Sequence, residues 1–280
     1  MIILIDFASL IILLACSEND NSLTSPNKTD KGTTISYSSA KLTASSSAGF
    51  NYSSSISNLN SFSSSSSSIS NLNSFSSSSN NTLIDPRDGQ KYKIVTIGTQ
   101  TWMAQNLNFE TTNSYCYNDD ISNCSKYGRL YTWAAAMDSI GKWSQNSKGC
   151  GFTTECTPTY PVQGACPTGW HLPMRTEFET LITAVGGYTL AGKTLKSTTN
   201  RNNCNEKNID GSDAYGLTIQ LAGYRDSYHN SVEEGCYTRF WTSTESLKAS
   251  STYMYLTYKN QIGFSNDLKY YGFSIRCIKD

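Results

Sequence analysis

The chain has 280 residues, of which 22 are basic and 22 acidic, so its formal net charge is zero at neutral pH. This balance, with no basic stripe, argues against a nucleic-acid-binding protein, because such proteins cluster Lys and Arg to neutralise phosphates. Hydrophobic residues make up 38% of the chain, and the region that follows residue 81 is long enough to bury one substantial core.

The N-terminus has the pattern of an exported lipoprotein. Residues 2–15 are almost all apolar, too short to cross a bilayer as a permanent helix and typical of a signal-peptide core. They run into Leu13-Leu14-Ala15-Cys16, which resembles a lipoprotein box. We therefore predict a signal peptide over 1–15, a lipid on Cys16 that anchors the chain to a membrane, and a location at the outer membrane or cell surface. The alternatives are a buried core helix and an uncleaved membrane helix.

A serine-rich segment follows. Between residues 53 and 79, 17 of 27 residues are serine, and the unit SISNLNSFS occurs twice. Two copies with three apolar residues each cannot build a core, so residues 16–81 are interpreted as a flexible linker. A partner-binding or glycosylated stalk is the alternative.

Residues 82–280 are expected to form one α+β domain. Alternating residues in 91–95 and 100–103, on either side of Gly98, predict an opening β-hairpin. Apolar residues at helical spacing then predict a helix over 129–139.

A second helix is predicted where Phe178, Leu181, Ile182 and Val185 repeat the helical spacing, ended by two glycines at 186 and 187. Glu177 occupies the acidic position of a capping box in its first turn. A short third helix is expected over 191–197. The late region is rich in Gly, Asn, Ser and aromatic residues, and strands are predicted at 218–223, 239–243, 252–258, 261–265 and 272–278.

Cysteine usage agrees with an oxidising compartment. Apart from Cys16, the chain has an even number of cysteines, enough for four disulfides. Proximity favours two short loops, Cys116 with Cys124 and Cys150 with Cys156, but spacing alone leaves the other pairings open. No Cys-x-x-Cys spacing is present, so structural zinc is not expected. The remaining candidates are Cys166, Cys204, Cys236 and Cys277.

The most informative motif is CPTGWHLP at 166–173, a turn-rich, cysteine-anchored start to the second predicted helix. With several further motifs, it resembles the Fibrobacter succinogenes major paralogous domain, a bacterial family of secreted or surface domains, over residues 82–280. The resemblance implies a C-type-lectin-like fold, as also found in formylglycine-generating enzymes, with two main helices and a loop-rich β region. It favours a Cys166–Cys277 bridge, which leaves Cys204 with Cys236. The further motifs are GTQTWMAQNLN at 98–108, YGRLYTWAAA at 127–136, LAGYR at 221–225, FWTSTE at 240–245 and YGFSIRCIKD at 271–280.

An oxidase is one hypothesis that this similarity raises. Formylglycine-generating enzymes carry a related helix start and, as the resemblance implies, need two nearby cysteines that bind copper. Cys277 has no cysteine in the preceding 40 residues, the nearest being Cys236, so a disulfide is the simpler interpretation. Of the two histidines, His171 lies in a structural turn, and no hydrolase, metalloprotease or phosphate-binding motif is present. We therefore expect no enzyme activity and no cofactor.

Binding is the better prediction, because the late segment is rich in aromatic residues. Flat rings with a polar tip stack on sugars or anchor protein partners, although strand alternation places some of them in the core. We predict a surface-anchored, non-catalytic domain that recognises a glycan or a protein; a structural or interaction module of a surface complex is the alternative. Residues 225–230 and 265–267 are expected to be exposed loops. The candidate ligand-binding residues are Tyr224, Arg225, Asp226, Tyr228, His229 and Asn266.

Calcium is a further possibility, because lectin-like folds sometimes use it. Asp210 and Asp213 share a tight turn, and Asp119 and Asp120 form another acidic pair. Neither pair belongs to a set of five or six oxygens at EF-hand spacing. A solvated acidic turn is the simpler interpretation of both.

Overall fold

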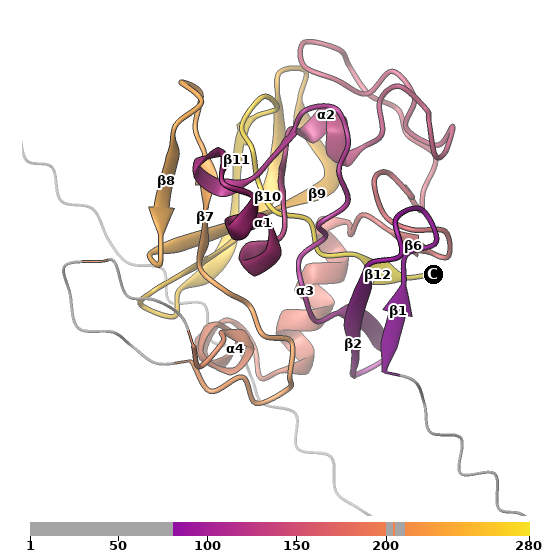
Figure 1. The fold of residues 1–280 in the computed structure, drawn as a ribbon. Coiled ribbons are helices and arrows are strands. Elements are labelled where there is room, and N and C mark those ends of the chain that lie inside the picture. The colour runs from indigo at the N-terminus through magenta and orange to yellow at the C-terminus, as the bar shows by residue number, and fades with distance from the viewer. Residues whose placement is uncertain (1–80, 200–203, 205–210) are drawn as a thin grey trace, which may run out of the picture. The chain divides into compact units, whose positions relative to one another are not determined.

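The computed structural model describes residues 81–199, 204 and 211–280. The predicted signal peptide, the lipidation site Cys16 and all but the last residue of the linker lie outside this part of the chain. The described region mixes helices and sheets, with more strands than helices, so the α+β prediction is confirmed at that level (Figure 1). In the described part of the chain, no helix has the length and apolar character needed to cross a bilayer.

The first sheet brings the two ends of the domain together. Its strand order is β1-β2-β3-β12-β6, and every pairing is antiparallel. The predicted hairpin is confirmed as β2 and β3, and Gly98 has φ of 60° in the turn between them, a conformation that favours glycine. The strands are β1 (Thr82–Ile84), β2 (Lys91–Ile97), β3 (Gln100–Met103), β6 (Trp170–His171) and β12 (Ile278–Lys279).

The second sheet has the order β11-β10-β9-β7-β8. All its pairings are antiparallel except β7 with β9, which are parallel through Gly223 and Thr238. A third, two-stranded sheet joins β4 (Ser114–Tyr115) to β5 (Leu130–Tyr131). The strands of the second sheet are β7 (Ala222–Arg225), β8 (Ser231–Glu234), β9 (Tyr237–Leu247), β10 (Ser250–Thr257) and β11 (Ile262–Leu268).

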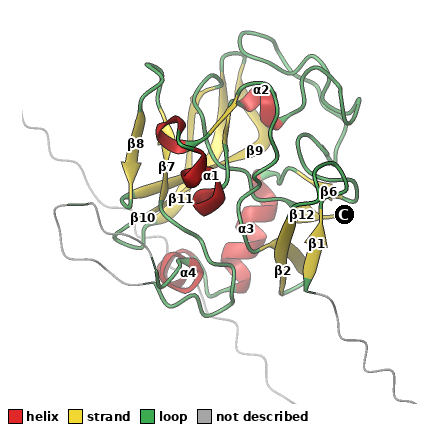
Figure 2. Cartoon of the chain, in the orientation of Figure 1, coloured by secondary structure: helices red, strands yellow, loops and turns green. Residues whose placement is uncertain are grey.

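Two helices cover one face of the second sheet. Helix α3 (Arg175–Ala184) contacts β9 and β10, and α4 (Tyr188–Leu195) contacts β11 (Figure 2). Their buried side chains form one core with residues of the sheet, such as Phe240 and Met254. The other segments are short: the 3-10 turn η1 (Tyr117–Asp119), α1 (Ile121–Tyr127) and α2 (Trp133–Ala136).

A second core lies on the opposite face of β9 and β10. It is built around Trp133, Trp241 and Phe273, all fully buried, and the rings of Trp241 and Phe273 are 4.2 Å apart between centroids. The Trp133 indole donates to the carbonyl of Thr242, and the Trp241 indole to that of Tyr131. The domain is therefore layered, with the second sheet between two apolar cores.

The helix predicted over 129–139 is wrong except at 133–136. Leu130 and Tyr131 form strand β5, and the helix that follows is the four-residue α2, which begins after the N-cap Thr132. Tyr131 pairs with Ser114 on one side and Phe273 on the other, so its backbone is extended. The apolar residues that suggested a helix are indeed buried. Strand pairing with distant segments buries them here, so no long helix is needed.

Helix α3 confirms the second predicted helix, and Glu177 accepts the Met174 backbone N–H at 2.7 Å, as a capping-box acid does. The third helix exists but is α4, which begins at Tyr188 and ends two residues before the predicted limit. The strands predicted at 239–243, 252–258 and 261–265 are confirmed as β9, β10 and β11, with shifted ends.

Two strand predictions are largely wrong. The strand expected at 218–223 is β7, which begins only at Ala222. The segment 272–278 is not a continuous strand, because it changes partner at each step: Gly272 bridges Arg225, Phe273 bridges Tyr131 and Ser274 bridges Phe240. Regular pairing returns only at β12.

The four expected disulfides are confirmed. Cys116–Cys124 and Cys150–Cys156 close short loops, and Cys166–Cys277 spans a sequence separation of 111. Cys204 pairs with Cys236. The long bridge joins the turn before β6 to the residue before β12, and both cysteines are fully buried.

Candidate functional site

The candidate site lies on the face of β9, β10 and β11 that is turned away from α3 and α4. Side chains alternate between the faces of a strand. Phe240, Met254 and Leu256 pack toward the helices. Their neighbours Arg239 and Tyr255, which are directly opposite each other in register, therefore project from the other face.

This face contains a groove with a cavity volume of about 240 Å³. Tyr255 forms one wall and lies across β11, where a Cβ at Gly263 would come within 2.8 Å of the Tyr255 hydroxyl. Glycine at 263 thus leaves room for the ring. The residues that line the groove, which we call the aromatic groove, are Tyr237, Arg239, Tyr253, Tyr255, Thr257, Gln261 and Ser265.

Arg239 is the central polar group of the aromatic groove. Its guanidinium carbon lies 3.7 Å from the ring centroid of Tyr224 and 5.1 Å from that of Tyr253. One nitrogen pairs with Asp267 at 2.9 Å. The carboxylate balances the charge, and the stacked rings fix the orientation of the guanidinium. The pair can therefore present oriented donors and acceptors to a neutral, hydroxyl-rich ligand.

Aromatic rings continue from Tyr224 along the surface. Tyr271 lies 6.4 Å from Tyr224 between centroids, Tyr270 stacks on Tyr271 at 5.5 Å, and Phe152 meets Tyr270 edge-on at 5.0 Å. Phe152 is 44% exposed. We call these four residues the tyrosine strip. Burial raises the pKa of the Tyr224 hydroxyl, against the opposing effect of Arg239, so this hydroxyl is a hydrogen-bond donor at neutral pH.

A buried lysine holds the loop that carries Phe152. The ammonium of Lys269 donates to the carbonyls of Gly151 and Thr154 at 3.1 and 3.0 Å, and it pairs with Glu245. The other oxygen of Glu245 accepts the backbone N–H of Cys156 at 2.9 Å. The loop is thus tied to the second sheet on both sides of Phe152, which positions this end of the tyrosine strip.

The structure separates the ligand-binding residues predicted from the sequence. Tyr224 belongs to the tyrosine strip. Arg225 projects from the other side of β7, pairing with Asp119 at 2.8 Å and stacking on Tyr115. Asn266 lies on the helix-covered face of β11, where its side-chain oxygen accepts from Thr252 at 2.9 Å. Arg225 and Asn266 therefore lie away from the aromatic groove.

The other three predicted residues form a turn. Asp226 accepts the backbone N–H groups of Tyr228 and Asn230, both at 2.8 Å, and His229 has a φ of 66°. The Tyr228 ring is 83% exposed. The loop predicted at 225–230 is thus confirmed from residue 226 onward and is exposed from Tyr228 onward. The segment 265–267 is exposed at Ser265 and Asn266, as predicted, but it belongs to β11 and is not a loop.

None of the residues that line the aromatic groove is among the six ligand-binding residues predicted from the sequence. The sequence did contain a signal for Arg239. Tyr237 and Arg239 are two positions apart in one strand, and Tyr253 and Tyr255 are two positions apart in the next, so each pair lies on one face of its strand. Once the strands are in register, these four side chains share a face. The register itself cannot be deduced from the pattern.

His171 is a structural tie in this fold. One ring nitrogen lies 2.7 Å from an Asp280 oxygen and the other 2.8 Å from a Glu177 oxygen. Burial disfavours the imidazolium, but hydrogen bonds to Glu177 and Asp280 outweigh it and raise the pKa of His171. The histidine joins β6 to the first turn of α3 and to the end of β12.

The acidic turns considered for calcium are engaged in local contacts where they are described. Asp119 pairs with Arg225, Asp120 accepts the Ser122 N–H as the N-cap of α1, and Asp213 accepts from the backbone and hydroxyl of Thr218. Asp210 lies outside the described residues. Within the part of the chain that the structure describes, His, Cys, Asp and Glu form no group suited to a metal ion.

Comparison with known proteins identifies one family. A model of the Fibrobacter succinogenes major domain matches residues 95–279, about two thirds of the chain and nearly all of the described domain. No curated protein and no solved structure matches the chain. The chain therefore belongs to the Fibrobacter succinogenes major domain family.

Proposed function

We propose that this protein is a non-catalytic binding domain that recognises a glycan through the aromatic groove and the tyrosine strip. The observation that carries the proposal is the coincidence of partly exposed rings with an oriented Arg239–Asp267 pair. Sugars present apolar ring faces and hydroxyl edges, and aromatic rings beside paired donors and acceptors match both.

The proposal includes a surface location. A lipid on Cys16 and the serine-rich linker over 16–81 attach the domain to the outer membrane or cell surface, where a polysaccharide is an accessible ligand. It also includes a C-type-lectin-like fold for residues 82–280. The opening hairpin, the two helices α3 and α4 and the loop-rich β region support that assignment.

Two further observations favour binding over the alternative functions. Formylglycine-type oxidase chemistry requires a free Cys277, and Cys277 is joined to Cys166. A purely structural module predicts that the late aromatic residues are buried. Of these, Trp241 and Tyr253 are buried, but Tyr228 is exposed and Tyr255, Tyr270 and Tyr271 are partly exposed.

The test is affinity gel electrophoresis of the purified full chain in gels that contain single soluble polysaccharides, for example xylan, mannan, β-glucan and pectin. Tyr255→Ala removes one wall of the aromatic groove. Tyr188→Ala is the matched control, because Tyr188 is 50% exposed but lies on α4, behind the second sheet.

We expect at least one polysaccharide to retard the unmodified chain and the Tyr188 variant equally. Loss of an aromatic anchor costs about 2 kcal/mol, so Tyr255→Ala weakens binding by roughly 30-fold. Equal retardation of both variants overturns the assignment of the site. Retardation by none of the polysaccharides favours the structural module.

A further inference from the structure

A second cavity, of about 230 Å³, lies on a different part of the domain, between β2, the segment after β3, helix α1 and Arg276. Its lining is polar and contains the amides Gln105, Asn106 and Gln220. Its charged residues are Lys91, Lys126 and Arg276, and none of the lining residues carries a carboxylate. We call this cavity the amide cleft.

Arg276 is the unusual group of the amide cleft. It is 2% exposed, and its guanidinium donates only to uncharged acceptors: the side-chain oxygen of Asn106 at 2.6 and 3.0 Å, and the carbonyls of Met103 and Leu217. Among the described residues it forms no ion pair. Burial lowers the pKa of Arg276 to about 9, which leaves it charged at neutral pH.

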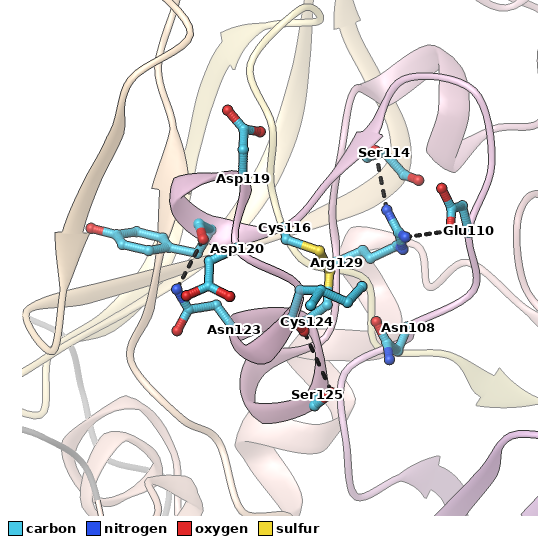
Figure 3. Close-up of a disulfide and its surroundings, with 12 residues drawn as sticks. Asn108, Glu110, Ser114, Cys116, Asp119, Asp120, Asn123, Cys124, Ser125 and Arg129 are labelled. Atoms are coloured by element: carbon cyan, nitrogen blue, oxygen red, sulfur yellow. Dashed lines mark hydrogen bonds and ion pairs between the residues drawn. A yellow bond between two sulfur atoms is a disulfide. The ribbon is translucent and has the colours of Figure 1, made fainter.

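Two other arginines of the domain, the buried Arg129 and the half-buried Arg87, show the usual arrangement. Arg129 pairs with Glu110 at 2.6 Å, as Figure 3 shows, and Arg87 pairs with Asp85 at 2.7 Å. A buried charge is costly unless a counter-charge balances it. Arg276 differs from both in lacking a carboxylate partner, and it is the one of the three that lines the amide cleft.

The donors of Arg276 are not all used. A guanidinium has five N–H donors, and four hydrogen bonds from Arg276 occur in the described part of the chain. One N–H of the Arg276 Nη2 atom therefore has no acceptor among these four hydrogen bonds. Buried donors require an acceptor, and the adjacent polar space that can supply one is the amide cleft.

The walls of the amide cleft are held in place before any ligand arrives. The Cys116–Cys124 disulfide pins α1, which carries the lining residue Ser125 next to Cys124 (Figure 3). Asn106 donates to the carbonyl of Tyr127 at 2.9 Å, fastening the end of α1 to the opposite wall. A rigid site loses little entropy when it binds.

We propose that the amide cleft binds a small anion, a carboxylate or sulfate group such as that of an acidic sugar, through Arg276 with Lys91 and Lys126. The anion gives Arg276 the direct ion-pair partner that the described residues do not supply. Asp213 acts on Arg276 only from a distance, and Lys126 already pairs with Glu234 at 3.4 Å, so Arg276 is the central group of the site. Amide side chains around it suit the hydroxyls of a sugar acid. The volume lies below the roughly 300 Å³ of drug-sized sites, so it fits one such unit. This site is separate from the aromatic groove and does not depend on it.

The test is an NMR titration of the Arg276 side-chain Nε–H in the ¹⁵N-labelled full chain, at constant ionic strength. The probes are sodium galacturonate, galactose as its neutral counterpart, and sodium sulfate. We expect galacturonate to shift this resonance saturably and galactose to leave it unchanged. An equal response to sulfate supports the anion site and assigns recognition to charge alone. No saturable shift with either anion overturns the proposal.

Two variants separate this site from a structural role of Arg276. Replacing Arg276 endangers folding, so Lys91→Gln, at an exposed lining position, is the working variant, and Lys248→Gln, at an exposed position outside the cleft, is its control. Loss of one partly screened charge weakens galacturonate binding about threefold in Lys91→Gln. Equal affinity in both variants contradicts a contribution from Lys91 and leaves the Arg276 titration to decide the site.

Discussion

The Cys166–Cys277 disulfide should make the largest covalent contribution to stability, because it closes the longest loop. The two cysteines are 111 residues apart, and the Cys204–Cys236 bridge inside that loop shortens it to an effective length of about 80 residues. The chain-entropy model then gives a stabilisation of about 4.5 kcal/mol. For Cys116–Cys124, with a separation of 8, it gives about 2.5 kcal/mol.

The double variant Cys166→Ala/Cys277→Ala is therefore expected to lose about 2 kcal/mol more stability than Cys116→Ala/Cys124→Ala. Urea unfolding followed by tyrosine and tryptophan fluorescence measures both. In thermal unfolding, the long-loop variant should melt about 10–20 °C below the unmodified protein. Equal losses in the two double variants would refute the argument from loop length.

Three further predictions concern single residues. Because the pKa of His171 is raised in the fold, its ion pairs stabilise most below the unfolded pKa of 6.5, and that contribution is lost as pH rises through the folded value. The unfolding free energies of the unmodified chain and of His171→Gln should therefore differ less at about pH 8 than at about pH 5. The decrease should be about 1.4 kcal/mol for each unit by which the folded pKa of His171 exceeds the unfolded one. A difference that does not change with pH contradicts this prediction. Gly192→Ala should destabilise by more than about 2 kcal/mol in urea unfolding, although alanine normally favours helices, because its Cβ would lie 1.8 Å from the Asn260 carbonyl oxygen. Gly151→Ala, with open space around it, is the control, and equal effects would contradict the reasoning. Cys16→Ala should abolish incorporation of labelled palmitate in a bacterial host, and continued labelling would exclude Cys16 as the lipid site.

Local patterns predicted the parts of the fold that depend on local chemistry. Helix α3 follows from the spacing of Phe178, Leu181 and Ile182, and all three are buried in the same core. The short disulfide loops follow from proximity along the chain. The helical spacing and the short cysteine separations each involve residues close together in the chain. Helix geometry and loop closure relate such residues without any help from the rest of the fold.

Non-local pairing explains what the sequence did not predict. Leu130 and Tyr131 carry helical spacing but form a strand, because β4 and the segment at Phe273 flank them. Arg239 meets Tyr224 only through the pairing of β7 with β9. Asn266 lies on the opposite face of β11 from Ser265 because the register of β11 places it beside Thr252. A shift of one residue reverses every side chain of a strand, and a single sequence does not specify that register.

The most direct test of the glycan-binding account maps the ligand on the protein. An oligosaccharide from the retarding polysaccharide is titrated into the ¹⁵N-labelled full chain, and backbone shifts are followed. The account predicts saturable shifts that centre on the residues around Arg239, Tyr255 and Tyr270, with α3 and α4 unaffected. Shifts centred on those helices, or no saturable shifts, would contradict it.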